Sequence, residues 1–184
     1  MTIKRANPRG GFTLIEVAIV IVIISVAVMG LMATISRIPV VEESNDEEIV
    51  ALRACKAMME QLVNQAETDF PNVYARYNGT VADDPVAGAS PGNDFDVDEL
   101  IPMDADADGM CGGIEFPELN DILNETVSDT DFGVGGIDMD GDGTALDADV
   151  RSTYRLLPVR VVVNFKSISG NNRQQSMVSI LYGD

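Results

Sequence analysis

The stretch Phe12–Ser36, FTLIEVAIVIVIISVAVMGLMATIS, is the longest apolar run of the chain and decides its architecture. Glu16 is its single charged residue, and 20 consecutive uncharged positions separate Glu16 from Arg37. At about 1.5 Å per residue, a helix of that length spans the ~30 Å hydrocarbon core of a bilayer. The sequence therefore predicts a transmembrane helix near the N-terminus.

The eleven residues before this run, MTIKRANPRGG, are basic and contain no acidic residue. Such a flank stays on the cytoplasmic side, so the C-terminal part of the chain is expected outside the cytoplasm. In a conventional secretory signal the small residues of the cleavage site follow the apolar run. Here Gly10 and Gly11 precede it, so cleavage next to these glycines would leave the apolar helix on the mature chain.

The heptapeptide Gly11–Val17, GFTLIEV, resembles the processing motif of type IV prepilins and type II secretion pseudopilins. The resemblance implies that a prepilin peptidase cuts after Gly11 and methylates the new amine of Phe12. It also implies that Glu16 pairs with the N-terminal amine of a neighbouring subunit and sets its register during assembly. The rival interpretation places Glu16, solvated, at the level of the lipid headgroups. A carboxylate in an apolar helix costs about 2.5 kcal/mol or more, which favours a functional role.

The charge balance is strongly acidic, with 12 basic and 30 acidic residues and a formal net charge of -18. The leader 1–11 carries three of the basic residues, so its removal leaves about -21. Such a chain repels phosphates, and a nucleic-acid partner is not expected. The sequence has no histidine, no nucleophile elbow and no isolated acid pair in an apolar setting, so we expect no enzyme activity.

Past the apolar run, Pro39 is expected to bend or stop the helix. The acidic run after it, Ser44-Asn45-Asp46-Glu47, fits a capping box and predicts a second helix from about Ser44 to Gln65. Its periodicity predicts an apolar face that packs on a sheet. The members of that face are Ile49, Leu52, Met59, Leu62 and Val63.

The C-terminal region predicts an antiparallel hairpin over about residues 153–183. The runs Tyr154–Lys166 and Gln174–Tyr182 are rich in β-branched and aromatic residues, and turn-forming residues separate them. Pro158 is expected at a strand start or edge. Between the second helix and this hairpin, residues 69–149 are rich in Asp, Gly and Asn, with a short helix expected at Pro117–Asn124.

These elements predict an α+β fold of pilin type. The expected parts are a leader at 1–11, a transmembrane or filament-core helix half at 12–38, an amphipathic half at 39–68 and a headpiece at 69–184. The long helix would pack on a small antiparallel sheet, as the resemblance implies. An 80-residue stretch without structure is uncommon in a compact domain, so something is expected to order residues 69–149.

Two acidic loops in this stretch match calcium-binding patterns. The first, residues 104–115, has the spacing of an EF-hand loop, with oxygen ligands expected from Asp104, Asp106, Asp108, the carbonyl of Met110 and Glu115. The second, residues 138–149, resembles dockerin calcium loops, with Asp138, Asp140, Asp142 and Asp149 as expected ligands. Ligation by oxygen alone favours Ca²⁺ over zinc, and magnesium is the weaker rival. The alternative is an acidic, solvated linker without ions.

Cys55 and Cys111 are the two cysteines of the chain. Outside the cytoplasm they are candidates for one disulfide, and the rival interpretation is two buried free thiols. Distances between them do not follow from the sequence, so both alternatives stay open.

The sequence as a whole predicts a structural filament subunit with two bound calcium ions. We expect it in the bacterial inner membrane before assembly, with a periplasmic headpiece, and then in an extracellular or periplasmic filament. Its expected partners are prepilin peptidase and other pilin subunits. Within the pilin class it resembles minor pilins and minor pseudopilins. The alternatives are a calcium-dependent adhesin at a filament tip and a major shaft pilin.

Overall fold

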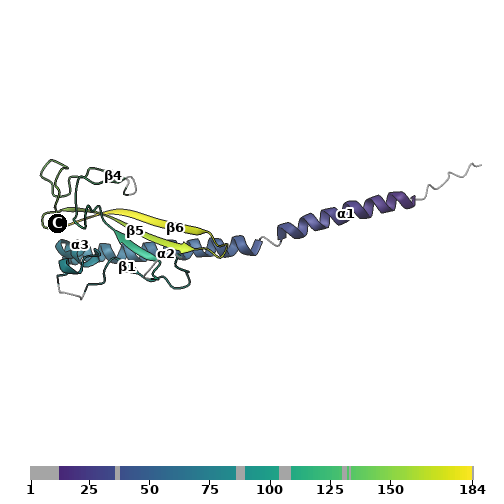
Figure 1. The fold of residues 1–184 in the computed structure, drawn as a ribbon, viewed down its shortest axis with the longest axis horizontal. Coiled ribbons are helices and arrows are strands. Elements are labelled where there is room, and N and C mark those ends of the chain that lie inside the picture. The colour runs from purple at the N-terminus through teal and green to yellow at the C-terminus, as the bar shows by residue number, and fades with distance from the viewer. Residues whose placement is uncertain are drawn as a thin grey trace, which may run out of the picture. The chain divides into compact units, whose positions relative to one another are not determined.

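The computed structural model describes residues 13–35, 38–85, 90–103, 109–129, 132 and 134–183. The chain divides into two compact units, Met1–Glu42 and Glu43–Asp184, and each is described by itself. The first unit contains helix α1, Leu14–Ile35, and the start of helix α2, Ile38–Asp69. The second contains the rest of α2 and the strands (Figure 1).

Helix α1 is apolar on all sides. The backbone N–H of Glu16 donates to the carbonyl of Thr13 at 3.0 Å, which places Glu16 in the first turn, where a carboxylate is favoured by the helix dipole. None of its side chains is buried by protein. By length and composition α1 is able to cross a membrane, and it is the one such helix among the described residues. The predicted apolar N-terminal helix is confirmed.

Helix α2 begins earlier than the sequence predicts. Pro39 lies in its first turn, where a missing N–H costs no hydrogen bond. The predicted capping box Ser44–Glu47 is therefore wrong, because these residues lie inside the helix. The Glu47 carboxylate instead accepts hydrogen bonds from the Ser167 hydroxyl at 2.5 Å and from the Ile168 N–H at 2.9 Å. Glu47, which the sequence predicts as a helix cap, therefore binds the turn of the β5–β6 hairpin.

The buried face of α2 also differs from the prediction. Met59 and Leu62 are buried as expected, whereas Ile49, Leu52 and Val63 are exposed. The buried stripe runs at helical spacing through smaller residues and consists of Ala51, Cys55, Met59, Leu62 and Ala66. Three of these five residues are Ala or Cys, so the buried face of α2 is not the face with the largest apolar side chains.

The main sheet has four antiparallel strands in the order β1-β2-β5-β6. They are β1 (Asp94–Phe95), β2 (Gly112–Glu115), β5 (Leu156–Lys166) and β6 (Asn172–Tyr182). The hairpin β5–β6 is in register from Leu156 opposite Tyr182 to Lys166 opposite Asn172, which confirms the prediction. Its turn uses Gly170 at φ 82°, a conformation that favours glycine. A second small sheet pairs β3 (Ser128–Asp129) with β4 (Val134–Gly135).

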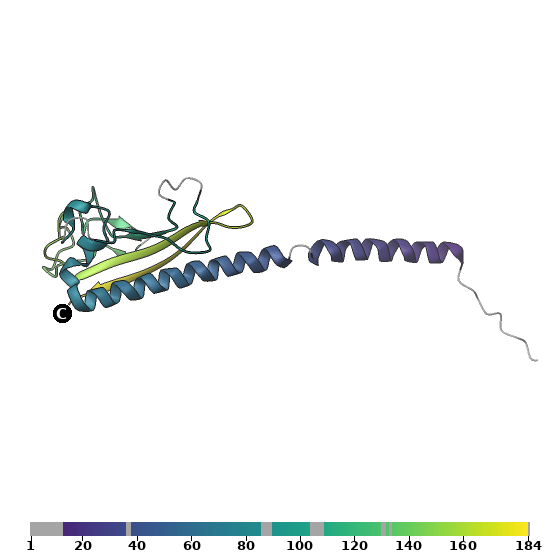
Figure 2. The same ribbon diagram turned by 90° about the horizontal axis from the view of Figure 1, so that it is seen from below.

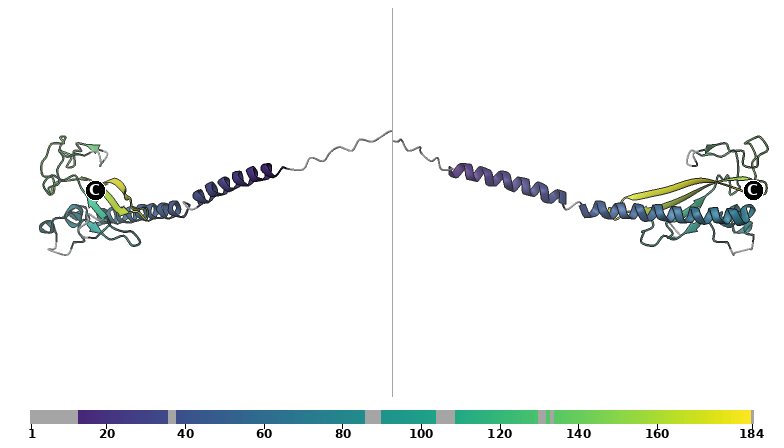
Figure 3. Two further views of the ribbon diagram at one scale, coloured as in Figure 1. Left: turned by 45° about the vertical axis from the view of Figure 1, so that its right-hand side comes forward. Right: turned by 180° about the vertical axis from the view of Figure 1, so that it is seen from behind.

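The core lies between α2 and the hairpin. Figure 2 and the right-hand view of Figure 3 show α2 running alongside β5 and β6. The alternate residues of β5 that face α2 are almost fully buried and consist of Leu157, Val159, Val161, Val163 and Phe165. A strand buried on both faces explains the nearly continuous apolar sequence of β5. The predicted α+β fold, with a helix packed on an antiparallel sheet, is confirmed.

After α2 the chain turns back through three short helices: Phe70–Asn72, α3 (Val73–Tyr77) and Val81–Asp83. Tyr154, which precedes β5, anchors this turn. Its ring packs edge-on against Phe70 at 5.0 Å between centroids, and its hydroxyl donates to the Phe70 carbonyl at 2.8 Å. Burial raises the pKa of the Tyr154 phenol to about 12.

The predicted short helix at Pro117–Asn124 is wrong. The backbone N–H of Leu119 donates to the carbonyl of Ile122 at 2.9 Å, and Glu118 bridges to Leu123. The two residues between, Asn120 and Asp121, have φ values of 56° and 62°. Asn and Asp tolerate this left-handed conformation and favour a tight two-residue turn over a helix.

Cys55 and Cys111 are both buried free thiols in the structure, so the candidate disulfide is not formed. The Cys55 thiol contacts the backbone carbonyl of Gln175 on β6 at 3.7 Å. The backbone carbonyl of Cys111 accepts a hydrogen bond from the N–H of Asn164, on the β2 side of β5. Burial raises the pKa of the Cys55 thiol to about 11, which makes it unreactive.

Candidate functional site

The predicted processing residues Gly11 and Phe12 lie outside the described residues. Glu16 lies in the first turn of α1 and is exposed. Its backbone N–H is also within 3.4 Å of the Thr13 hydroxyl. The carboxylate therefore stands at the N-terminal end of the apolar helix, close to the predicted cleavage position in sequence.

The first predicted calcium loop is only partly described. Asp104, Asp106 and Asp108 lie outside the described residues, while Met110 is exposed and directly precedes the buried Cys111. Glu115, the predicted closing ligand, lies in β2 opposite Arg160 of β5. Its Oε2 is 2.9 Å from the Arg160 Nε. A bidentate role for Glu115 at a metal ion would compete with this ion pair.

The second predicted loop brings three of its four predicted ligands together. Carboxylate oxygens of Asp138, Asp140 and Asp142 lie within 4.8 Å of one another. The Asp138 carboxylate accepts the N–H groups of Gly141, Asp142 and Gly143 at 2.6, 3.1 and 2.9 Å. This folds the loop around its first residue. Gly141 and Gly143 have φ values of 78° and 99°, so the turn requires glycine there.

Glu125, which the sequence did not single out, is the buried end of this cluster. It is 1% exposed, and its Oε1 accepts the N–H of Met139 at 2.5 Å and of Asp140 at 3.2 Å. Its Oε2 accepts the N–H of Asp147 at 3.3 Å. Carboxylate oxygens of Glu125, Asp140 and Asp147 form a second group within 4.8 Å. Glu125 therefore joins both ends of the loop to the interior.

Asp149, the predicted fourth ligand, is placed elsewhere. Its carboxylate faces the Arg151 guanidinium, with Nε–Oδ1 and Nη2–Oδ2 distances both 2.9 Å. Hydrogen bonds from Arg151 lower the pKa of Asp149. Arg151 also reaches Asp83 at 3.4 Å, so this pair ties the loop to the segment after α3. Asp147, two residues earlier, points its carboxylate into the cluster instead.

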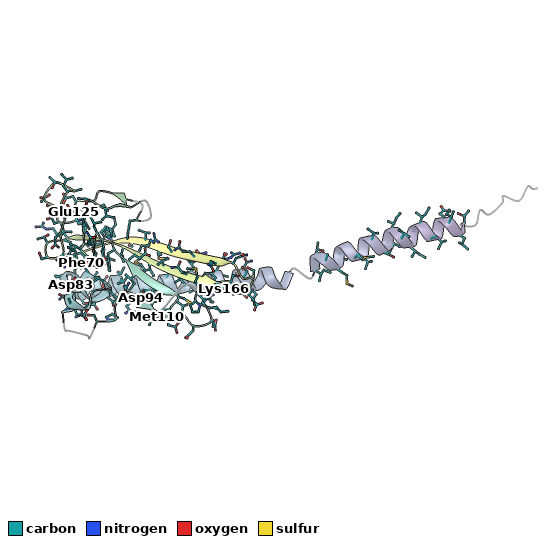
Figure 4. All side chains as sticks on the ribbon, viewed as in Figure 1. Phe70, Asp83, Asp94, Met110, Glu125 and Lys166 are labelled. Carbon is teal, nitrogen blue, oxygen red and sulfur yellow. The ribbon has the colours of Figure 1, made fainter. Side chains whose placement is uncertain are left out.

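The close carboxylates of the cluster affect one another's protonation. The pKa of Asp147 is raised, first by desolvation and then by the nearby carboxylates of Asp142, Asp140, Glu125 and Asp138. Glu125 itself lines a small cavity together with the apolar residues Phe132, Ile137 and Met139. Figure 4 shows Glu125 well separated from Met110, which belongs to the described end of the first predicted loop.

Known proteins give one family match. Residues 7–32 match the model of the prokaryotic N-terminal methylation motif. No curated protein and no solved structure is significantly similar to the chain. The matched segment covers Gly11, Phe12 and Glu16 and most of α1. The chain therefore carries a prepilin-type methylation motif on a membrane-length helix, which supports a type IV pilin-like or pseudopilin subunit.

Proposed function

We propose that the chain is a minor subunit of a type IV pilus or a type II secretion-like filament, with a headpiece stabilised by calcium. The carrying observation is the methylation motif at residues 7–32 on a helix long enough to cross a bilayer. Prepilin peptidase would cut after Gly11 and methylate Phe12. The subunit would wait in the inner membrane, with its headpiece in the periplasm, before it enters the filament. Glu16 would set its register against the neighbouring subunit.

The calcium proposal rests on the cluster of Asp138, Asp140, Asp142, Asp147 and Glu125. Like charges at such short range repel one another strongly unless a cation neutralises them. Carboxylate oxygens are hard ligands, and Ca²⁺ accepts six to eight of them in flexible geometry. This set exchanges the predicted Asp149 for Asp147 and adds the buried Glu125. An ion held there would fasten the loop to the core, so its binding energy would stabilise the fold.

We keep the first loop, Asp104–Glu115, as a second proposed calcium site. Asp104, Asp106, Asp108 and the Met110 carbonyl would supply most of its ligands. Glu115 would have to leave Arg160, so this ion is expected to bind more weakly than the one beside Glu125.

Calcium titration of the purified full chain in detergent micelles tests the proposed set of ligands. At a free concentration of 100 times Kd, one ion adds about 2.7 kcal/mol to the free energy of unfolding. We expect the calcium-dependent rise in Tm to be strongly reduced in Asp147→Asn and largely kept in Asp149→Asn. Asp121→Asn, in an exposed turn outside the loop, is the matched control. Equal calcium shifts in Asp147→Asn and the unchanged chain would contradict the proposed site.

The minor role is tested separately by counting subunits in isolated filaments. A minor subunit is present at a small fraction of the abundance of the shaft subunit. If this chain makes up most of the filament mass, it is the major pilin.

A further inference from the structure

Helix α2 is attached to the headpiece in two different ways along its length. Over residues 51–66 it is held by the buried apolar stripe described above. Over residues 43–50, all of which the structure describes, Ser44 is the one buried side chain, and it is polar. The compact headpiece begins at Glu43, so these two turns are the part of α2 at which the helix enters it.

The first two turns contact the hairpin turn through polar groups. The Glu47 carboxylate accepts the hydroxyl of Ser167 at 2.5 Å with Oε2 and the N–H of Ile168 at 2.9 Å with Oε1. The hydroxyl oxygens of Ser44 and Ser167 lie 3.3 Å apart. One carboxylate thus binds both a side chain and the backbone of the turn.

An ion pair extends this contact to the start of β6. The Glu48 carboxylate pairs with the Arg173 guanidinium, and the two side chains are 34% and 38% exposed. Water and salt therefore reach the pair and weaken it. We call the whole set the polar clamp. It consists of Ser44, Glu47 and Glu48 on α2 and of Ser167, Ile168 and Arg173 on the hairpin.

Opening the polar clamp requires less than opening the apolar stripe. Its polar groups can exchange their partners for water, so each contact contributes little net free energy. The stripe has no such alternative, because separation would expose Cys55 and Leu62, both fully buried. Phe165, the last fully buried apolar residue of β5, lies below the turn and outside the clamp. Segments with few buried apolar contacts are those that open locally in native proteins.

We propose that the polar clamp opens while the headpiece stays folded, and that Glu47 is the residue that holds it closed. In the open form the carboxylates of Glu47 and Glu48 are hydrated, and the hairpin turn, residues 167–171, separates from α2. The stripe from Ala51 onward and the β5–β6 ladder stay in place. The headpiece can then loosen its hold on the incoming helix without unfolding its core. Neither the proposed filament role nor the proposed calcium site enters this inference.

Amide hydrogen exchange of the full chain in detergent micelles, followed by NMR, tests for this opening. The N–H of Ile168 reports on the clamp because Glu47 accepts its hydrogen. The N–H groups of Val161 and Val163, in the middle of the β5–β6 ladder, report on the core. We expect the protection of Ile168 to be at least tenfold lower than that of either valine. Equal protection at the three positions would mean that the clamp opens only when the headpiece unfolds, which would overturn the proposal.

A matched pair of substitutions tests the role of Glu47. Glu47→Ala should lower the protection of Ile168 by about tenfold to hundredfold, the effect of losing a hydrogen bond to a charged group. Glu43→Ala, at an exposed position one turn earlier, should leave it unchanged. Val161 and Val163 should keep their protection in both variants. The proposal is overturned if Ile168 does not respond to Glu47→Ala, or if the valines lose as much protection as Ile168.

A disulfide across the clamp gives the converse test. The Ser44 and Ser167 hydroxyl oxygens are close enough for a double variant, Ser44→Cys, Ser167→Cys, to join the two sides. Oxidation with a small-molecule disulfide should raise the protection of Ile168 toward that of Val161, and reduction should reverse the change. If mass spectrometry shows the disulfide and Ile168 exchanges as fast as before, the turn opens without separating from α2 and the proposal is wrong.

Discussion

The acidic region, residues 69–149, and the C-terminal hairpin are ordered by different interactions. Residues 69–149 hold 21 of the 30 acidic residues and one basic residue, Arg76. They fold through turns and side-chain bonds to backbone N–H groups, as at Asp138 and Glu125. The hairpin instead has an eleven-pair ladder and a strand buried on both faces. We therefore expect calcium to control the loops and apolar burial to control the hairpin.

The largest expected effect comes from the hairpin core. Phe165 is fully buried in β5, and Phe165→Ala should lower the free energy of unfolding by about 3–5 kcal/mol. The loss should be the same in calcium and in chelator, because no proposed ligand contacts this position. Denaturant titration followed by circular dichroism measures both values. A loss that depends strongly on calcium would break the distinction between the two regions.

For the acidic loops we expect the opposite behaviour, an effect of substitution at Glu125 that depends on calcium. Glu125→Gln keeps an acceptor for the N–H groups of Met139 and Asp140 but removes a charge from the cluster. The stabilisation by calcium, about 2.7 kcal/mol at 100 times Kd, should largely disappear. In chelator the substitution should cost less than in calcium, since relief of charge repulsion offsets the lost acceptor for the Asp147 N–H. Thermal unfolding with and without calcium measures this, and an equal cost in both conditions would assign Glu125 a purely structural role.

Tyr154 lies at the junction of the two regions. Its raised pKa predicts that the stability of the fold decreases at alkaline pH. Its phenol has a pKa of about 12 in the fold, against an ordinary value of 10. Between these values the unfolded chain loses the proton and the folded chain keeps it, so stability falls as pH rises from 10 to 12. The loss amounts to about 2–3 kcal/mol. Tyr154→Phe should flatten this part of the pH profile in denaturant titrations, and an unchanged slope would contradict the assignment to Tyr154.

The two regions also differ in how far sequence reasoning reaches. The hairpin was predicted because β-branched strands and a Gly170 turn are local signals. Asp138, Asp140 and Asp142 were found for the same reason, since their alternate spacing is visible in six residues. Glu125 was missed because it lies 13 residues before Asp138 in the sequence and reaches the loop only through the tertiary fold.

Helix α2 shows a second limit of local patterns. Its apolar periodicity admits two faces, one with Ile49, Leu52 and Val63 and one with the smaller Ala51 and Cys55. Side-chain size favours the first face, but the second face is the one that the fold buries. The helix start was missed because Pro39 is compatible with a first turn as well as with a break. In both cases the sequence pattern allowed two structures, and the tertiary fold determined which of them formed.

The smallest expected effects come from a matched pair of glycines, one in each region. Gly141 and Gly170 have φ values of 78° and 82°, and a Cβ added at either meets no atom closer than ordinary contact. Replacement by alanine therefore costs mainly the backbone conformation, about 1 kcal/mol in both. Gly170→Ala should show this loss with and without calcium. Gly141→Ala should in addition weaken calcium binding, because the carboxylates of Asp138 and Asp142 converge through its turn. Since the backbone cost is matched, the difference between the two variants in calcium titrations isolates the contribution of the ion. A difference of zero would mean that calcium contributes no more to the fold at Gly141 than at Gly170.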